Sequence, residues 1–306
     1  MALRVAFLGN DPRSVPTLEA LAASPHETVV VVTREPRPAG RGGEPRPTAV
    51  AGAARRLGLS LHEVATVKEG EGREALERAG PDVLVVVAYG EILPADILAV
   101  PRLAPINVHF SLLPELRGAD PVRRAILEGL ATTGVTTMRM DEGMDTGPIL
   151  LQAEEPIGDD DDAGALGQRL AVLGARLLVE TLDRLEDIEE RPQDEARATV
   201  APKIPREEEW IDWSEPADAV VRRVRALSPE PGARTRLRGK VLKVYRARAV
   251  DGEGGEPGTV VSPEELVVAG GEGAVALEEV LPEGRRRMRG VELAHGHRPE
   301  PGERLG

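Results

Sequence analysis

The sequence predicts an α/β fold, with a mostly parallel sheet in its first part and a small antiparallel β-barrel in its last third. Nearly unbroken apolar runs at 4–8, 28–33 and 82–88 are typical of strands buried on both faces of a sheet. The first two enclose a helical pattern, and a strand, helix and strand within about 30 residues make the sheet Rossmann-like. The barrel is predicted by short strand patterns with turn residues between them, at 235–238, 241–246, 258–261, 265–268 and 274–279.

The turn after the first strand does not suit a dinucleotide, because Gly-Asn-Asp-Pro replaces the G-x-G-x-x-G pattern. Ser14 follows this turn and is placed to cap a helix. Further helices are predicted over 49–57 and 72–78. From 166 to 185, leucines recur every three or four residues, which predicts a long helix packed on the sheet.

Composition and charge exclude several classes of protein. With 306 residues the chain has room for two domains, and without cysteine it has neither disulfides nor thiolate metal sites. No signal peptide or long apolar run appears, so we expect a soluble, cytoplasmic protein with no membrane partner. The net charge of −13 argues against a general nucleic-acid binder. Residues 201–250 are the exception, since they hold twelve Lys and Arg against seven Asp and Glu.

A polar stretch divides the chain. Between 189 and 206 the helical periodicity is lost and prolines recur, which is typical of an interdomain linker. We therefore expect one domain at 1–188 and a second at 207–306. The four aspartates at 159–162 lack the spacing of a Ca²⁺ loop, so we interpret them as an acidic cap on the helix that follows.

Two side chains suited to catalysis stand at the end of a predicted strand. Alternate residues of a strand face the same side, so Asn107 and His109 point the same way. An amide can donate to a developing oxyanion, and an imidazole can polarise a carbonyl or pass a proton near neutral pH. Taken alone, however, such a His is more often a buried core residue. An Asp in a turn sequence such as Asp145-Thr-Gly-Pro148 is more often structural.

Several motifs that occur together in a fixed order favour the catalytic interpretation of these residues over the structural one. They are Asn107-x-His109, Ser111-Leu-Leu-Pro114, Arg117-Gly118 and Met144-Asp-Thr-Gly147. Together they resemble the folate-dependent formyltransferases, which move a formyl group from 10-formyltetrahydrofolate to a primary amine. The resemblance implies a catalytic triad of Asn107, His109 and Asp145, and no need for a metal. It also implies that the folate, a cosubstrate, is bound by Ser111, Leu112, Leu113, Pro114, Tyr89, Gly90 and Ile92.

The resemblance extends over nearly the whole chain to the members of the family that formylate methionyl initiator tRNA for translation initiation. It implies that the barrel is OB-like and binds this tRNA, and we expect a monomer. The loop at 34–47, rich in Arg, Pro and Gly, would enter the acceptor end of the tRNA. On composition alone this loop could equally be a solvated linker, and the basic run at 285–289 a charged strand edge. The residues expected to contact tRNA are Arg41, Lys203 and Arg286.

Other interpretations remain open at this stage. Formyltransferases for glycinamide ribonucleotide share the triad but end after the first domain. A formyltransferase for a nucleotide aminosugar has a second subdomain, although the basic loop around Arg41 disfavours it. A non-catalytic RNA-binding protein is disfavoured by the intact triad. The chain departs from the usual family pattern at Asn10, Asp11 and Asp120, which could alter the pocket or the site for the end of the tRNA.

Overall fold

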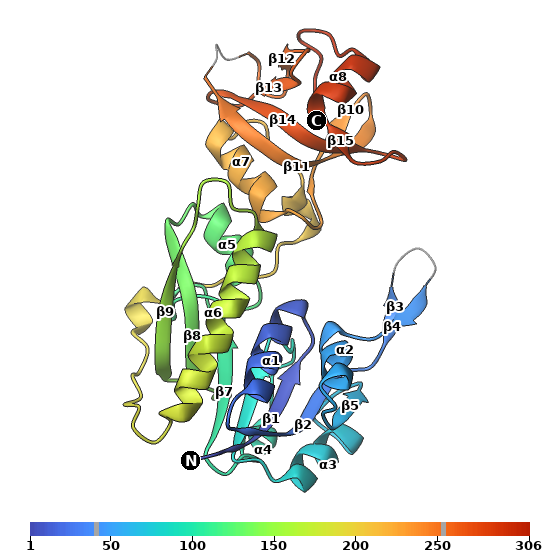
Figure 1. The fold of residues 1–306 in the computed structure, drawn as a ribbon. Coiled ribbons are helices and arrows are strands. Elements are labelled where there is room, and N and C mark those ends of the chain that lie inside the picture. Colours follow the sequence, from blue (N-terminus) through green and yellow to red (C-terminus); the bar gives the residue numbers. More distant parts are fainter. Residues whose placement is uncertain (40–42, 252–254) are drawn as a thin grey trace. The chain divides into compact units, whose positions relative to one another are not determined.

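The chain forms two compact units in the computed structural model, which describes residues 1–39, 43–251 and 255–306 (Figure 1). Unit 1 comprises Met1–Pro121, Thr132–Pro156 and Gly167–Ala201. Unit 2 comprises Val122–Ala131, Ile157–Leu166 and Pro202–Gly306. Neither unit is one continuous stretch, so the division into domains at 1–188 and 207–306 stays a prediction.

Unit 1 is built on a seven-stranded sheet with the order β5-β2-β1-β6-β7-β8-β9. The strands from β5 to β7 in this order are parallel, whereas β8 and β9 are antiparallel to their neighbours. The mostly parallel, Rossmann-like sheet is therefore confirmed. The strands are β1 (Arg4–Gly9), β2 (Glu27–Arg34), β5 (Leu61–Val64), β6 (Val83–Val87), β7 (Ala104–His109), β8 (Thr132–Arg139) and β9 (Ile149–Pro156).

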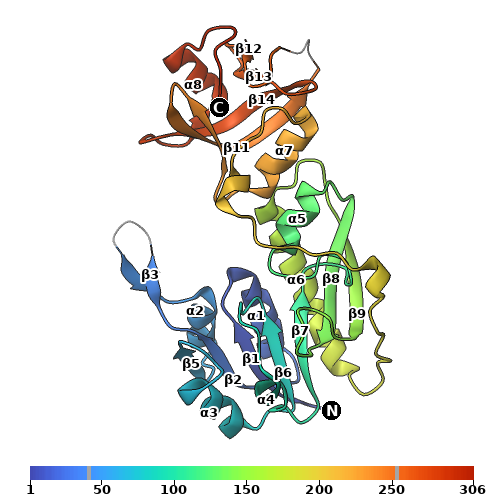
Figure 2. The same cartoon turned by 180° about the vertical axis from the view of Figure 1, so that it is seen from behind.

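Helices cover both faces of this sheet. On one face, alternate residues of β1 such as Leu8 form a core with Leu76 and Ile97. On the other, α6 approaches β7 so closely that a Cβ on Gly174 would stand 2.9 Å from Cγ1 of Val108. The long helix α6 lies in front of the sheet in Figure 1, and α4 is seen on the opposite face in Figure 2. The helical segments are η1 (Pro12–Ser14), α1 (Val15–Ala23), α2 (Ala49–Arg56), α3 (Gly70–Ala79), α4 (Ala95–Leu98), α6 (Ala163–Asp183) and η2 (Glu195–Arg197).

The start of α1 corrects the sequence prediction for Ser14. Its hydroxyl makes no capping bond and instead donates to the carbonyl oxygen of Val87 at 2.7 Å. Ser14 is fully buried, and a Cβ on Gly9 would come within 2.8 Å of the Ser14 Cβ. A buried hydroxyl needs a partner, and the nearby end of β6 supplies one. The bond ties the segment after β1 to the carboxyl end of the next strand in the sheet.

The run of four aspartates caps α6 as predicted. Asp162 Oδ1 accepts a hydrogen bond from the Ala165 backbone N–H at 2.8 Å, within the first turn. Asp161 Oδ2 accepts from the N–H of Gly158 at 2.7 Å. Among the residues that the structure describes, no group of three or more His, Cys, Asp or Glu is arranged to hold a metal ion.

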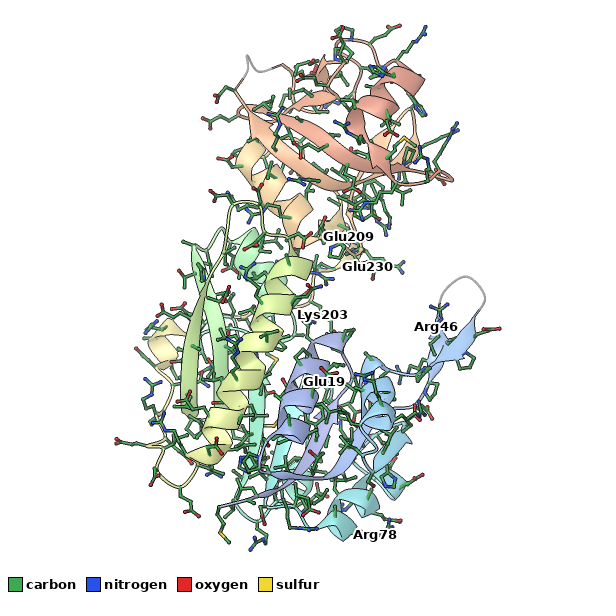
Figure 3. All side chains as sticks on the ribbon, in the orientation of Figure 1. Glu19, Arg46, Arg78, Lys203, Glu209 and Glu230 are labelled. Atoms are coloured by element: carbon green, nitrogen blue, oxygen red, sulfur yellow. The ribbon has the colours of Figure 1, made fainter. Side chains whose placement is uncertain are left out.

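The described flanks of the Arg-rich loop form a hairpin rather than an irregular loop. Strand β3 (Arg37–Ala39) pairs antiparallel with β4 (Glu44–Arg46). Arg46, labelled in Figure 3, is exposed at the end of β4. Arg41, the residue expected to contact tRNA, lies outside the described residues.

Unit 2 holds an antiparallel sheet with the order β10-β11-β14-β13-β12, and β15 also pairs with β14. The C-terminal residues connect its two edges, because Leu305 bridges Leu237 at the end of β10 and Arg304 bridges Thr259 beside β12. The sheet is thereby closed around a core that includes Trp213, as in a small barrel. The elements of unit 2 are α5 (Pro121–Leu127), η3 (Arg206–Glu209), α7 (Ala217–Ala226), β10 (Ala233–Leu237), β11 (Lys240–Val250), β12 (Val260–Ser262), β13 (Val267–Ala269), β14 (Ala274–Pro282), β15 (Met288–Arg289) and α8 (Gly290–His297).

In the described part of the chain, no helix is both long enough and apolar enough to cross a membrane.

We expect Gly290→Ala to loosen unit 2, because a Cβ at this position would stand 1.7 Å from the carbonyl oxygen of Leu277 in β14. Overpacking of this kind costs about 1–3 kcal/mol. Hydrogen exchange followed by mass spectrometry should show a matching loss of protection for the β14 amides. Gly296→Ala in the same helix is the control, since its Cβ meets nothing within 4 Å. Equal protection of β14 in the two variants would contradict the close contact.

Candidate active site

Strand β7 delivers Asn107 and His109 to one place. It lies between β6 and β8, with Asn107 opposite Met138 and His109 opposite Thr136. The two side chains are two residues apart and therefore share a face of the sheet. His109 is only 6% exposed, and Asn107 is half-buried. Both polar groups thus need partners within the protein.

Asp145 supplies those partners. Its Oδ1 accepts a hydrogen bond from Asn107 Nδ2 at 3.2 Å, and its Oδ2 lies 3.6 Å from His109 Nδ1. Oδ2 also accepts from the backbone N–H of Gly118 at 2.8 Å. The structure therefore brings together the three residues that the family resemblance implies as a triad. The Arg-Gly motif contributes a backbone donor to the same carboxylate.

The second ring nitrogen of His109 fixes its tautomer. Nε2 lies 2.9 Å from the carbonyl oxygen of Leu116. A carbonyl oxygen can only accept, so Nε2 carries a proton and donates it. The neutral ring then has its lone pair on Nδ1, the nitrogen that faces Asp145. A proton that this ring takes up or gives away is exchanged at Nδ1.

The loop that carries Asp145 adopts an unusual backbone conformation. Asp145 has φ +56°, in the left-handed region, which costs a residue other than glycine roughly 1–2 kcal/mol. Gly147 cannot carry a side chain, because its Cβ would stand 1.9 Å from the carbonyl oxygen of Arg139. The amide of Gln193 donates to the carbonyl oxygens of Asp145 and Gly147, at 2.8 and 2.7 Å. Such a conformation persists only where neighbouring groups hold it, as they do here.

The Ser-Leu-Leu-Pro segment is part of the interior. Ser111 Oγ donates to the Glu115 carbonyl oxygen at 2.6 Å. Thr136 Oγ1 donates to the Ser111 carbonyl oxygen at 2.7 Å and accepts from the Leu113 N–H at 3.0 Å. Ser111, Leu113 and Pro114 are buried, whereas Leu112 is half-buried. Folate binding by these residues stays a prediction, and the burial favours contact through the backbone rather than through the side chains.

In the loop after β6, some of the residues expected to bind folate are likewise buried and others are exposed. Tyr89 is 2% exposed, and burial, with the nearby Glu91 carboxylate as a further cause, raises the pKa of its phenol. Gly90 and Ile92 are exposed, Ile92 to 68%. Only the latter two of the folate residues predicted in this loop present a surface to a ligand.

A hollow of about 610 Å³ borders the loop that leads to Asp145. Its volume lies within the range of about 300–1,000 Å³ that is usual for small-molecule sites. The lining is mixed, with apolar residues from around α4 and β7 on one side and a polar loop on the other. The lining residues are Ala95, Leu98, Ala99, Pro105, Met140, Asp141, Glu142 and Gly143.

Asn10, one of the departures from the family pattern, ties three strand ends together. Its amide nitrogen donates to the Tyr89 carbonyl oxygen after β6. Its Oδ1 accepts from Thr33 Oγ1 at 3.0 Å and from the Arg34 N–H at 2.7 Å, at the end of β2. Asn10 itself follows β1, so one amide fixes the carboxyl edge of the sheet.

Asp11 and Asp120, the two acidic residues at which the chain departs from the family pattern, both interact with Arg13. Asp11 Oδ1 accepts from Arg13 Nε at 2.8 Å, and the guanidinium lies over the Phe110 ring, 5.8 Å from its centroid. Burial lowers the pKa of Arg13, but the hydrogen bond and charge of Asp11 and the charge of Asp120 outweigh it and raise the pKa. The departures therefore hold a fixed cation beside Phe110, the residue after His109.

Sequence reasoning missed Gln193 and Thr136. Thr136 stands opposite His109 in β8, so its position could have been found from the pairing of β7 and β8. Gln193 lies in the aperiodic stretch interpreted as a linker, and no local pattern marks it. Of the residues expected to contact tRNA, Lys203, labelled in Figure 3, is exposed, and the Arg286 side chain is 81% exposed.

A partly buried amide, imidazole and carboxylate in contact can stabilise an oxyanion and move a proton, which is the chemistry of an acyl-group transferase. Comparison with protein families gives the particular class. Residues 3–182 match the formyl transferase family model, and residues 203–298 match the model of the formyl transferase C-terminal domain. The chain belongs to the formyl transferase family.

Two of the curated relatives that match nearly the whole chain carry the same name. Methionyl-tRNA formyltransferase of Solibacter usitatus is 44% identical over 307 residues, covering 99% of each chain. Methionyl-tRNA formyltransferase of Thermus thermophilus is 46% identical over 306 residues, also covering 99% of each.

Solved structures share the fold at lower identity. An N-formyltransferase from Helicobacter canadensis, in complex with folinic acid and dTDP-3-aminofucose, gives a TM-score of 0.68 at 17% identity over 90% of this chain and 99% of its own. HypX from Aquifex aeolicus, in complex with tetrahydrofolic acid, gives 0.67 at 19% over 96% of this chain and 47% of its own. Glycinamide ribonucleotide transformylase 1 from Symbiobacterium toebii gives 0.51 at 23% and covers 63% of this chain and 95% of its own.

Proposed function

We propose that this protein transfers a formyl group from 10-formyltetrahydrofolate to the amino group of methionyl initiator tRNA, which prepares the tRNA for translation initiation. The observation that carries the proposal is the match to relatives named methionyl-tRNA formyltransferase, at 44–46% identity over both units. The contact of Asp145 with Asn107 and His109 gives this activity a chemical basis. The expectations of a monomer and of a cytoplasmic location stay predictions.

In the proposed reaction, the methionyl amine attacks the formyl carbon and an oxyanion forms on the tetrahedral intermediate. Asn107 Nδ2 has two N–H bonds and gives one to Asp145, so the other is available to the oxyanion. His109, with both ring nitrogens protonated, adds a positive charge nearby. The carbon–nitrogen bond to the folate then breaks, and the formyl group stays on the amine.

The amine must also lose a proton, and the departing folate nitrogen must gain one. The geometry supports exchange at His109 Nδ1, because Nε2 is committed to the Leu116 carbonyl. Asp145 Oδ2 lies 3.6 Å from Nδ1 and is placed to take part in the transfer, directly or through a water molecule. One proton moves from the amine to the folate, so charge balances over the reaction.

We place the folate beside the loop that precedes Asp145. The hollow there is large enough for a small ligand, and Met140, Asp141 and Gly143 belong to its wall. The folate residues implied by the resemblance do not line this hollow; of them, Gly90 and Ile92 offer exposed surface after β6, at the carboxyl edge of the sheet, where α/β proteins bind ligands. A folate donor is also supported by the structural neighbour HypX, whose structure was solved in complex with tetrahydrofolic acid.

For the tRNA, unit 2 offers a groove lined by arginines. A hollow of about 630 Å³ there is lined by Arg246, Arg248, Arg286, Arg287 and Arg289 together with four glutamates. Arg287 is held 2.6 Å from Glu279, whereas Arg286 lies 3.6 Å from Glu292 and is the more exposed of the two. Of these two, Arg286 is therefore the side chain that we expect to meet a phosphate, with Arg41 and Lys203 as further contacts.

We expect Asn107→Ala and His109→Ala each to lower kcat by about 10²–10³ or more, because an oxyanion donor or the proton carrier is lost. The measurement is transfer of labelled formyl from 10-formyltetrahydrofolate to methionyl initiator tRNA, with a nucleotide aminosugar offered in parallel. Arg78→Ala, an exposed arginine of α3 labelled in Figure 3, is the control and should keep wild-type activity.

Each other outcome excludes part of the proposal. Product on the aminosugar alone would keep the chemistry but reject tRNA as the acceptor. No transfer to either amine would favour a non-catalytic RNA-binding protein. Activity of both alanine variants within tenfold of wild type would show that the catalytic roles are wrong.

We expect Arg286→Ala and Arg41→Ala to raise KM for the tRNA while kcat stays close to wild type. If each arginine contacts one phosphate, its loss should reduce the salt dependence of binding by about one counterion. The check is KM measured over a series of salt concentrations. Arg78→Ala again serves as the control, since it removes the same charge from a different surface. An equal rise in KM for all three variants would point to net charge rather than to contact.

A further inference from the structure

Residues 193–201, expected as part of a linker, pack against the turn around Arg117. The Arg117 N–H donates to the Thr199 carbonyl oxygen at 2.9 Å, and the Ala201 N–H donates to the Arg117 carbonyl oxygen at 2.6 Å. The Leu116 N–H donates to Thr199 Oγ1 at 2.8 Å. All of these residues belong to unit 1. The segment is thus part of the support of the candidate active site.

Gln193 makes the most direct link from this segment to the site. Its Nε2 donates to the carbonyl oxygens of Asp145 and Gly147, and its Oε1 accepts from Arg117 Nε and Nη2 at 3.0 and 2.9 Å. Arg117 is held in turn by Glu195 at 2.7 Å. Carbonyl oxygens only accept and a guanidinium only donates, so the amide has a single possible orientation. Its two N–H donors and its oxygen are all used.

The position of the Asp145 carboxylate depends on these bonds. Asp145 has φ +56°, and this left-handed backbone conformation sets the direction of its side chain. The Gln193 bonds hold the carbonyl groups of residues 145 and 147, on both sides of Thr146. They fix the main chain that aims the carboxylate at Asn107 and His109. Gln193 contacts only the main chain of Asp145 within the triad, and it takes no part in the contacts among the three triad side chains.

We propose that Gln193 is a positioning residue for formyl transfer, which rests on the function proposed above. It acts through Asp145, by holding the turn in the one conformation in which the carboxylate meets both partners. Group transfer depends steeply on alignment, and a displacement of about 1 Å can lower a rate roughly 100-fold. The residue comes from a stretch with no catalytic motif.

The test is Gln193→Glu, which keeps the length of the side chain and an acceptor for Arg117 but removes both N–H donors. We expect kcat to fall roughly 10- to 100-fold because the carboxylate loses alignment, while KM for folate and amine changes by less than about threefold. Gln193→Ala should likewise lower kcat and leave KM nearly unchanged. Hydrogen exchange at the Gly118 amide, which donates to Asp145 Oδ2, should become faster in both variants.

Arg197→Ala is the matched control. Arg197 lies in the same segment, but its guanidinium contacts the Glu115 carboxylate at 2.9 Å rather than the Asp145 turn. This ion pair is exposed, so its loss should leave kcat within about twofold of wild type.

A kcat for Gln193→Glu within about threefold of wild type, or a loss confined to KM, would overturn the positioning role. Unfolding of both Gln193 variants, seen by circular dichroism, would also overturn it, because the residue would then be a general stabiliser. If the wild-type protein formylates an amine other than methionyl-tRNA, the proposed function fails separately. The same ratio of kcat values, measured with that amine, still decides the role of Gln193.

Discussion

The placement of the Asp145 carboxylate is the constraint on which the rest of the site depends. A partly buried carboxylate is stable only where donors surround it. Here Asn107 donates from β7, the Gly118 N–H donates from a turn, and His109 faces the same oxygen as Gly118. β7, the turn at Gly118 and the loop that carries Asp145 must therefore all be in place before the carboxylate has its partners. The site forms with the fold of unit 1 and cannot form before it.

The reversal of strand direction at β8 makes this arrangement possible. β8 runs antiparallel to β7 and ends with Arg139 opposite Ile106, beside Asn107. The loop that follows therefore starts next to the residue that Asp145 must reach. A parallel β8 would end at the level of the other end of β7. The same strand places Thr136 opposite His109, where it braces the Ser111 turn. One change of direction in an otherwise parallel sheet thus serves both sides of the site.

The features that the sequence predicts correctly are those with a local pattern. Apolar runs mark the buried strands, and the two-residue repeat of a strand is enough to place Asn107 and His109 on one face. The features it does not predict come from single long-range bonds. The Ser14 hydroxyl binds a carbonyl 73 positions away, and the Gln193 amide binds the carbonyl of a residue 48 positions away. Neither bond leaves a trace in periodicity, because each joins residues that are far apart in the sequence.

The two units divide the proposed reaction between chemistry and affinity. The hydrogen-bond partners described for Asn107, His109 and Asp145 lie in unit 1, whereas the arginine-lined groove lies in unit 2. Contacts equally strong in the ground state and the transition state lower KM without raising kcat, so groove contacts of this kind set only how well the acceptor is held. The glycinamide ribonucleotide transformylase from Symbiobacterium toebii covers 63% of this chain and 95% of its own, so part of this fold occurs without the rest. The network around Asp145 lies within unit 1, so its geometry is constrained separately from the arginine-lined groove of unit 2.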